Sequence, residues 1–130
     1  MPDPKRRDLV PDQFGDKALT AEEAYSACGP AAAVAFARAH GRNPTLREAL
    51  DLAKQVGWTQ AGGMNGAENQ KRLLDRMGIA AQLDTSGNRQ RIRSEAESGN
   101  PVTISTARHY FVADGFKGGK YHVGASGRAI

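Results

Sequence analysis

The spacing of apolar residues changes about halfway along the chain. In the first half, apolar residues recur every three or four positions, which is the spacing of an amphipathic helix. Three segments show this pattern, at residues 30–41, 46–57 and 67–78. A shorter helix is expected in "LTAEEAYSA", residues 19–27, because Thr20 and Glu23 have the spacing of a capping box. The pattern therefore predicts four helices between residues 19 and 78.

Local signals predict where these helices begin and end. Pro30 has no backbone N–H and suits the first turn of a helix, and Gly41 suits its C-terminal end. This helix is so rich in alanine that we expect it to pack closely against its neighbours on most sides. Thr45 and Glu48 indicate a second capping box, and Gly78 ends the last of the four helices.

The second half of the chain favours strands. "IAAQL", residues 79–83, is interpreted as a short strand, and residues 89–98 as a basic then acidic helix closed by a glycine. Three strands are expected in "PVTIST", "HYFVADGF" and "KYHVG", the last two joined by a "KGG" hairpin turn. This order predicts an α+β fold in which N-terminal helices pack on a C-terminal antiparallel sheet.

The chain is expected to form one domain preceded by an arm. Residues 1–18 are rich in proline and charge and indicate an extended arm, and residues 19–130 are assigned to a single domain. The length of 130 residues suits one hydrophobic core. There is no apolar segment typical of a signal peptide or a membrane span, so we expect a cytoplasmic protein, or a virion protein if the chain is phage-encoded.

Composition argues against several classes of function. The net charge is +4, but the basic residues are spread out and aromatic residues make up only 6%, which argues against a nucleic-acid partner. The single cysteine cannot form an internal disulfide. None of the three histidines has a short ligand spacing to that cysteine or to another histidine, so neither a metal nor another cofactor is expected.

The single cysteine, Cys28, lies directly before Gly29 and Pro30, where a helix is expected to begin. A helix N-terminus favours the thiolate, which is the nucleophilic form of cysteine, and a nearby imidazolium favours it further. His40 lies about 18 Å away along the same helix and is too distant. His109 begins an expected strand and is the better partner, whereas His122 is left open.

The order of these motifs resembles the papain-like cysteine peptidases of family C39 and its relatives. The likeness rests on "YSACGPAAAVAFARAHG", then "GNPVTISTARHYFVADGF" about 80 residues later, then "GKYHV". It covers nearly the whole chain, roughly residues 19–124. The resemblance implies a papain-like fold in which Cys28 is the nucleophile and His109 is the general base.

Two supporting positions depart from the pattern of that family. Its members usually have a glutamine about six residues before the cysteine, where its amide binds the oxyanion, but residue 22 here is Glu22. Gln13 is the nearest upstream glutamine and is the candidate for that role. The family also has an Asp or Asn after the final strand to orient the histidine, where this chain has Ala125. Ser126 is the candidate replacement, because Asp114 would point to the opposite face from His109 in a regular strand.

Two functions follow from this reading. The first is a cysteine peptidase or amidase that hydrolyses a peptide or isopeptide bond of a peptide or protein substrate through a Cys28 thioester. The alternative is a non-catalytic module that keeps the peptidase fold, for example in a phage virion or tail. In that case the N-terminal arm would contact other virion or assembly proteins.

Overall fold

The computed structural model describes residues 14–64, 66–84, 88–105, 110–117, 120–125 and 128–129. Within these ranges the protein is a mixed α+β structure, which confirms the predicted fold class. It has five helices and four strands. The helices are α1 (Ala21–Tyr25), α2 (Cys28–Ala39), α3 (Leu46–Lys54), α4 (Ala67–Arg76) and α5 (Arg89–Glu97). The strands are β1 (Val102–Ser105), β2 (Tyr110–Lys117), β3 (Lys120–Ala125) and β4 (Arg128–Ala129).

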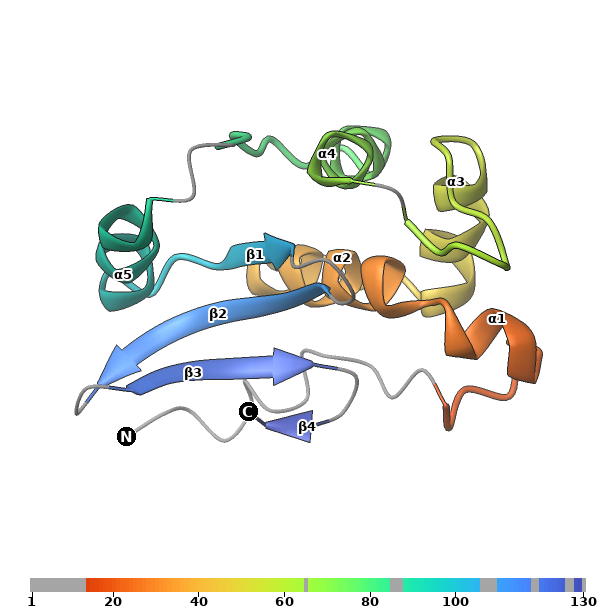
Figure 1. Ribbon diagram of the computed structural model, residues 1–130, viewed down its shortest axis with the longest axis horizontal. Coiled ribbons are helices and arrows are strands. Elements are labelled where there is room, and N and C mark those ends of the chain that lie inside the picture. The colour runs from red at the N-terminus through yellow and green to blue at the C-terminus, as the bar shows by residue number, and fades with distance from the viewer. Residues whose placement is uncertain are drawn as a thin grey trace.

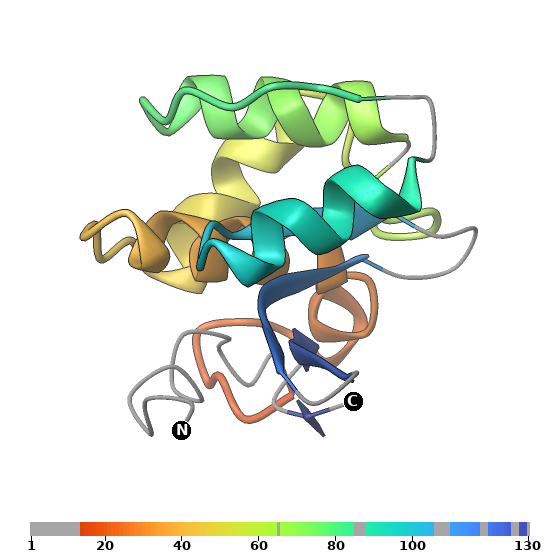
Figure 2. The same cartoon turned by 90° about the vertical axis from the view of Figure 1, so that its left-hand side faces the viewer.

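Helix α2 lies at the centre of the molecule. It packs against α3 and α4 on one side and against the sheet on the other, and both views show it between these layers (Figures 1 and 2). Helix α5 packs against β1 and β2 (Figure 1). All residues of α2 from Gly29 to Ala37 are buried, which confirms the expectation that the alanine-rich helix is enclosed. Small side chains allow this close approach from several directions.

Helix α2 differs from its expected bounds at its start. It begins at Cys28, two residues before Pro30, so the proline occupies the third helical position. A proline is tolerated there because the N–H groups of a first turn have no partner within the helix. At the other end, Gly41 has a φ of +78° and its N–H donates to the Arg38 carbonyl, while the Arg42 N–H donates to the Ala37 carbonyl. These two bonds form the Schellman motif that the glycine predicted.

The two predicted capping boxes differ in completeness. Thr20 and Glu23 form a full box, in which the threonine hydroxyl accepts from the Glu23 N–H and the carboxylate accepts from the Thr20 N–H. At α3, the Thr45 hydroxyl accepts from the Glu48 N–H at 3.1 Å and itself donates to the Glu48 carboxylate at 3.0 Å. The carboxylate therefore binds the hydroxyl of the cap residue.

The sheet is antiparallel throughout, in the order β1-β2-β3-β4. Lys117 of β2 pairs with Lys120 of β3, in agreement with the predicted hairpin, whose Gly118 and Gly119 lie outside the described residues. The register between β2 and β3 shifts between Ala113 and Gly115, which places a bulge at Asp114. Strand β4 was not predicted, because it has only two residues.

The prediction of a strand at residues 79–83 is wrong. This segment has no regular secondary structure, and Ile79 is its only buried residue. Arg91 of α5 instead donates to the amide oxygen of Gln82 in this segment at 2.8 Å, and to the carboxylate of Asp84, the next residue after it, at 3.2 Å. A strand needs a partner for its backbone groups, and this segment is connected to its neighbour through side chains.

Residues 14–18, at the end of the expected arm, form turns. The Asp16 carboxylate accepts from the Ala18 N–H at 2.9 Å, and the Asp16 carbonyl accepts from the Leu19 N–H at 3.2 Å. Residues 1–13 of the arm lie outside the described residues. Among the helices of the described part, none combines the length and the apolar composition needed to cross a membrane.

Candidate functional site

Cys28 is the first residue of α2 and is partly buried against the hydrophobic core. The residue before the helix, Ala27, has no side-chain oxygen, so the first turn of α2 has no side-chain cap. Because Pro30 has no N–H, the first turn of α2 has backbone N–H groups only at Cys28 and Gly29, and no side chain of Ala27 caps them. Such groups favour negative charge, either on a thiolate or on an oxyanion.

Gly29 is required by the close approach of its neighbours. A Cβ at this position would lie 2.8 Å from Met64 Cβ and 3.2 Å from Gln70 Oε1, so the backbone here has no room for a side chain. The Gln70 side-chain amide donates to the Gly29 carbonyl at 2.9 Å, and Gln70 is only 3% exposed. Its Oε1 atom has no hydrogen-bond partner among the described residues. Gln70 therefore holds the backbone next to Cys28 from inside the core.

The turn at residues 59–63 is joined to the segment just before Cys28. Trp58 is buried at the end of α3, and its indole N–H donates to the Ser26 carbonyl at 2.8 Å. The Ser26 hydroxyl in turn donates to the Gln60 carbonyl at 2.7 Å. Because Ser26 is bound on both sides, the approach to the α2 start has a defined conformation.

Of the predicted site residues, only Cys28 is described by the structure. His109, Gln13 and Ser126 lie outside the described residues. Tyr110, which follows His109 in the sequence, is the first residue of β2, and its hydroxyl donates to the Met64 carbonyl at 3.4 Å. Met64 also packs on Gly29, so the start of β2 and the start of α2 contact the same residue.

The residues that depart from the family pattern occupy defined positions. Glu22 is exposed on α1. Ala125 ends β3 and pairs with Arg128 of β4. Asp114 lies at the shift of register between β2 and β3, between Ala113 and Gly115.

The Glu23 carboxylate joins α1 to α3. The sequence had identified it only as part of a helix cap. Glu23 accepts from both terminal nitrogens of Arg47 at 3.0 Å and from Lys54 Nζ at 3.1 Å. The Arg47 hydrogen bonds, then the Thr20 N–H and Lys54, hold the pKa of the Glu23 carboxyl well below its usual range. The predicted capping box identified Glu23, but its partners lie 24 and 31 residues away in the sequence.

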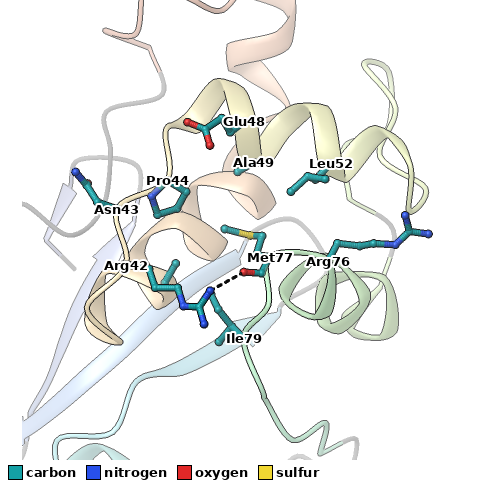
Figure 3. A pocket seen from close by; sticks show the side chains of 10 residues that line it. Arg42, Asn43, Pro44, Glu48, Ala49, Leu52, Arg76, Met77 and Ile79 are labelled. Carbon is teal, nitrogen blue, oxygen red and sulfur yellow. Dashed lines mark hydrogen bonds between the residues drawn. The ribbon is translucent and has the colours of Figure 1, made fainter.

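A separate hollow of about 370 Å³ lies at the other end of α2 (Figure 3). It is lined by residues of the α2–α3 connection, of α3 and of the end of α4. Arg42 crosses it and donates to the Met77 carbonyl at 3.3 Å. Ala37, the residue of α2 that lines this hollow, is about 14 Å from Cys28 along the helix. This hollow is therefore not part of the site around Cys28.

Comparisons of the chain with protein-family models, with curated proteins and with solved structures found no match. Within the described ranges, no group of three or more His, Cys, Asp or Glu side chains is arranged to hold a metal ion. The chemistry that can be argued for this site therefore rests on Cys28 and its surroundings.

Proposed function

We propose that the protein is a cysteine peptidase or amidase of papain-like fold, which hydrolyses a peptide or isopeptide bond with Cys28 as nucleophile and His109 as general base. The observation that carries the proposal is that Met64 contacts both Gly29 and Tyr110, the neighbours of Cys28 and His109 in the sequence. In addition, Cys28 begins a helix with no side-chain cap.

The proposed reaction needs only these two side chains and water. The Cys28 thiolate attacks the carbonyl carbon to form a C–S bond, and the carbonyl oxygen becomes an oxyanion. The backbone N–H of Cys28, at the start of α2 without a side-chain cap, is suited to donate to that oxyanion. The C–N bond then breaks, and the leaving amine takes a proton from the His109 imidazolium. Water then attacks the thioester carbon and gives one proton to His109. The C–S bond breaks, the carboxylic acid leaves, and the Cys28 thiolate and the His109 imidazolium are restored.

A backbone donor at the start of α2 matters because the glutamine of the family pattern is missing from this chain. The resemblance implied that a glutamine amide supplies one oxyanion donor, and residue 22 is instead an exposed glutamate. Loss of one such donor costs about a hundredfold to a thousandfold in rate. The proposal therefore predicts a slow enzyme if Gln13 does not replace the missing amide.

The test is the rate at which iodoacetamide alkylates Cys28 at pH 7, followed by intact mass. The chain has one cysteine, so the mass change reports Cys28 alone. We expect His109→Ala to slow alkylation by about tenfold, since it removes the imidazolium that stabilises the thiolate. His40→Ala is the matched control, because His40 lies beyond the far end of α2. Equal rates in the two variants would refute the pairing of Cys28 with His109.

The partial burial of Cys28 supports a second candidate, the non-catalytic module. A structural cysteine reacts slowly and at the same rate whether or not His109 is present. For this candidate, Cys28→Ala leaves the function intact, and deletion of residues 1–17 abolishes association with an assembly partner. Size-exclusion chromatography of the two variants with the partner distinguishes these outcomes.

A further inference from the structure

A hollow of about 520 Å³ lies between α1 and the turn at residues 59–63, on the segment that leads to Cys28. This volume lies within the range of about 300 to 1,000 Å³ that is typical of small-ligand sites. Five residues line it, namely Ala21, Glu22, Tyr25, Gln60 and Ala61. The hollow thus has two small apolar residues, one aromatic ring, one amide and one carboxylate.

The aromatic and the acidic side chain of this hollow, Tyr25 and Glu22, are not used by the fold. Tyr25 is 80% exposed, the most exposed of the large apolar side chains in the described residues. Glu22 is exposed as well, whereas its neighbour Glu23 is buried in ion pairs. Within the described part of the chain, neither the Tyr25 hydroxyl nor the Glu22 carboxylate has a hydrogen-bonding or ion-pair partner. Both groups are therefore available to a ligand.

The walls of the hollow are held in place before any ligand binds. On one side, Ser26 follows directly after Tyr25 and is bonded to both Trp58 and Gln60. On the other side, Thr59 and Gly63 exchange two backbone hydrogen bonds of 3.1 and 2.7 Å. Because the backbone of these walls is already ordered, ligand binding has to order only the side chains of Tyr25 and Glu22.

We propose that this hollow binds a lysine or arginine side chain of the peptide substrate. The Glu22 carboxylate attracts the cationic end, and the face of the Tyr25 ring attracts the same charge through its quadrupole. The aliphatic part of the side chain lies against Ala21 and Ala61, as such stems do on apolar surface. An acidic substrate side chain is repelled by Glu22, and an apolar substrate side chain gains no electrostatic attraction from it.

The position of the hollow determines how far the cationic residue lies from the substrate bond that Cys28 attacks. This step rests on the proposed function. Tyr25 and Cys28 are three residues apart, so their Cα atoms are separated by at most about 11 Å. An extended peptide covers about 3.3 Å per residue. The cationic residue is therefore expected a few residues from the bond that Cys28 attacks, on the same peptide segment.

The test measures binding without catalysis, in the full chain carrying Cys28→Ser. The probe is the capped tetrapeptide Gly-Lys-Gly-Gly, titrated while amide ¹⁵N chemical shifts are recorded. We expect shifts at Ala21, Gln60 and Ala61, and binding about tenfold weaker for the peptide with norleucine in place of lysine. Glu22→Gln should weaken lysine-peptide binding by a similar factor, whereas Glu68→Gln, an exposed glutamate on α4, should not.

Equal affinity for the lysine and norleucine peptides would overturn the inference, as would equal effects of Glu22→Gln and Glu68→Gln. The two proposals fail separately. Selective lysine binding with no effect of His109→Ala on Cys28 alkylation supports the hollow and removes the peptidase. The opposite result keeps the peptidase and removes the cationic subsite.

Discussion

Replacing Glu23 with glutamine tests whether the ion pairs between α1 and α3 stabilise the fold. The Glu23 side chain is 10% exposed, and its two oxygens accept from Arg47, Lys54 and the Thr20 N–H at 3.0 to 3.1 Å. Glutamine has nearly the same shape, but it removes the charge and turns one acceptor into a donor. That donor would face the cationic groups that the carboxylate now binds.

The expected cost follows from the exposure of the partners. Breaking a fully buried ion pair costs about 3 to 5 kcal/mol, whereas an exposed pair contributes about 0 to 1 kcal/mol. Here Lys54 is 45% exposed, and Arg47 keeps a second partner in Asp51 at 2.6 Å. We therefore expect Glu23→Gln to lower the free energy of unfolding by about 2 to 3 kcal/mol at pH 7.

The cost should also depend on pH. The pKa of Glu23 is lower in the folded protein than its ordinary value of 4.5, because Arg47, the Thr20 N–H and Lys54 stabilise the carboxylate. The unfolded chain therefore binds a proton more readily, and the stabilisation is complete above that value and lost as the pH falls below it. The difference between wild type and Glu23→Gln should shrink from about pH 5 downward.

Urea unfolding at pH 7 and at pH 3.5, followed by the fluorescence of the single tryptophan, measures both effects. Trp58 is buried and reports loss of the core. Glu22→Gln is the matched control, since it changes the neighbouring but exposed carboxylate and should stay within about 0.5 kcal/mol of wild type. Equal stability of the two variants, or a difference that does not change with pH, would refute this account of Glu23.

Three further substitutions have expected outcomes. Gly29→Ala should destabilise by about 1 to 3 kcal/mol in thermal unfolding, because its Cβ would lie 2.8 Å from Met64 Cβ, and a neutral effect would argue against that close approach. Trp58→Phe should cost about 1 to 3 kcal/mol by circular dichroism in urea, since it leaves the Ser26 carbonyl without its donor. Leu50→Ala should cost about 2 to 5 kcal/mol in the same assay, because Leu50 is fully buried, and a loss below 1 kcal/mol would place it outside the core.

Several helix ends were predictable because the interactions that set them are local, although α2 begins two residues before its expected start and α3 ends at Lys54, before its expected end at residue 57. Thr20 with Glu23 is a contact across three residues, and the Schellman motif at Gly41 needs only a residue that accepts a positive φ. The sequence therefore contains the whole cause of these features. The same reasoning explains the correct ends of α4 and α5 at Gly78 and Gly99, which also have positive φ values.

Features that depend on distant partners were not predictable in this way. Five residues at 79–83 have the composition of a strand, but only the rest of the fold decides whether a strand partner is within reach. Here Arg91 binds the side chains of this segment instead. The bulge at Asp114 is similar, because a shift in register is a property of two strands and cannot be inferred from one.

The same distinction applies to the candidate site. The sequence predicted that Cys28 lies at a helix start, but not that Gln70 and Trp58 fix the backbone on either side of it. These two residues bind Gly29 and Ser26 from 41 and 32 residues away. Each is an ordinary polar or aromatic position on its own segment, and no local pattern marks it.

These contacts explain part of the Cys-Gly-Pro motif by packing, without catalysis. Gly29 is required by Met64 and Gln70, and Ala27 is fully buried, so a polar cap at that position would lie in the core. A non-catalytic module with the same packing would need the same glycine and alanine. Cys28 also packs against the core, so its place at the start of α2 suits either function. The effect of His109 on the reactivity of Cys28 therefore decides between the enzyme and the module.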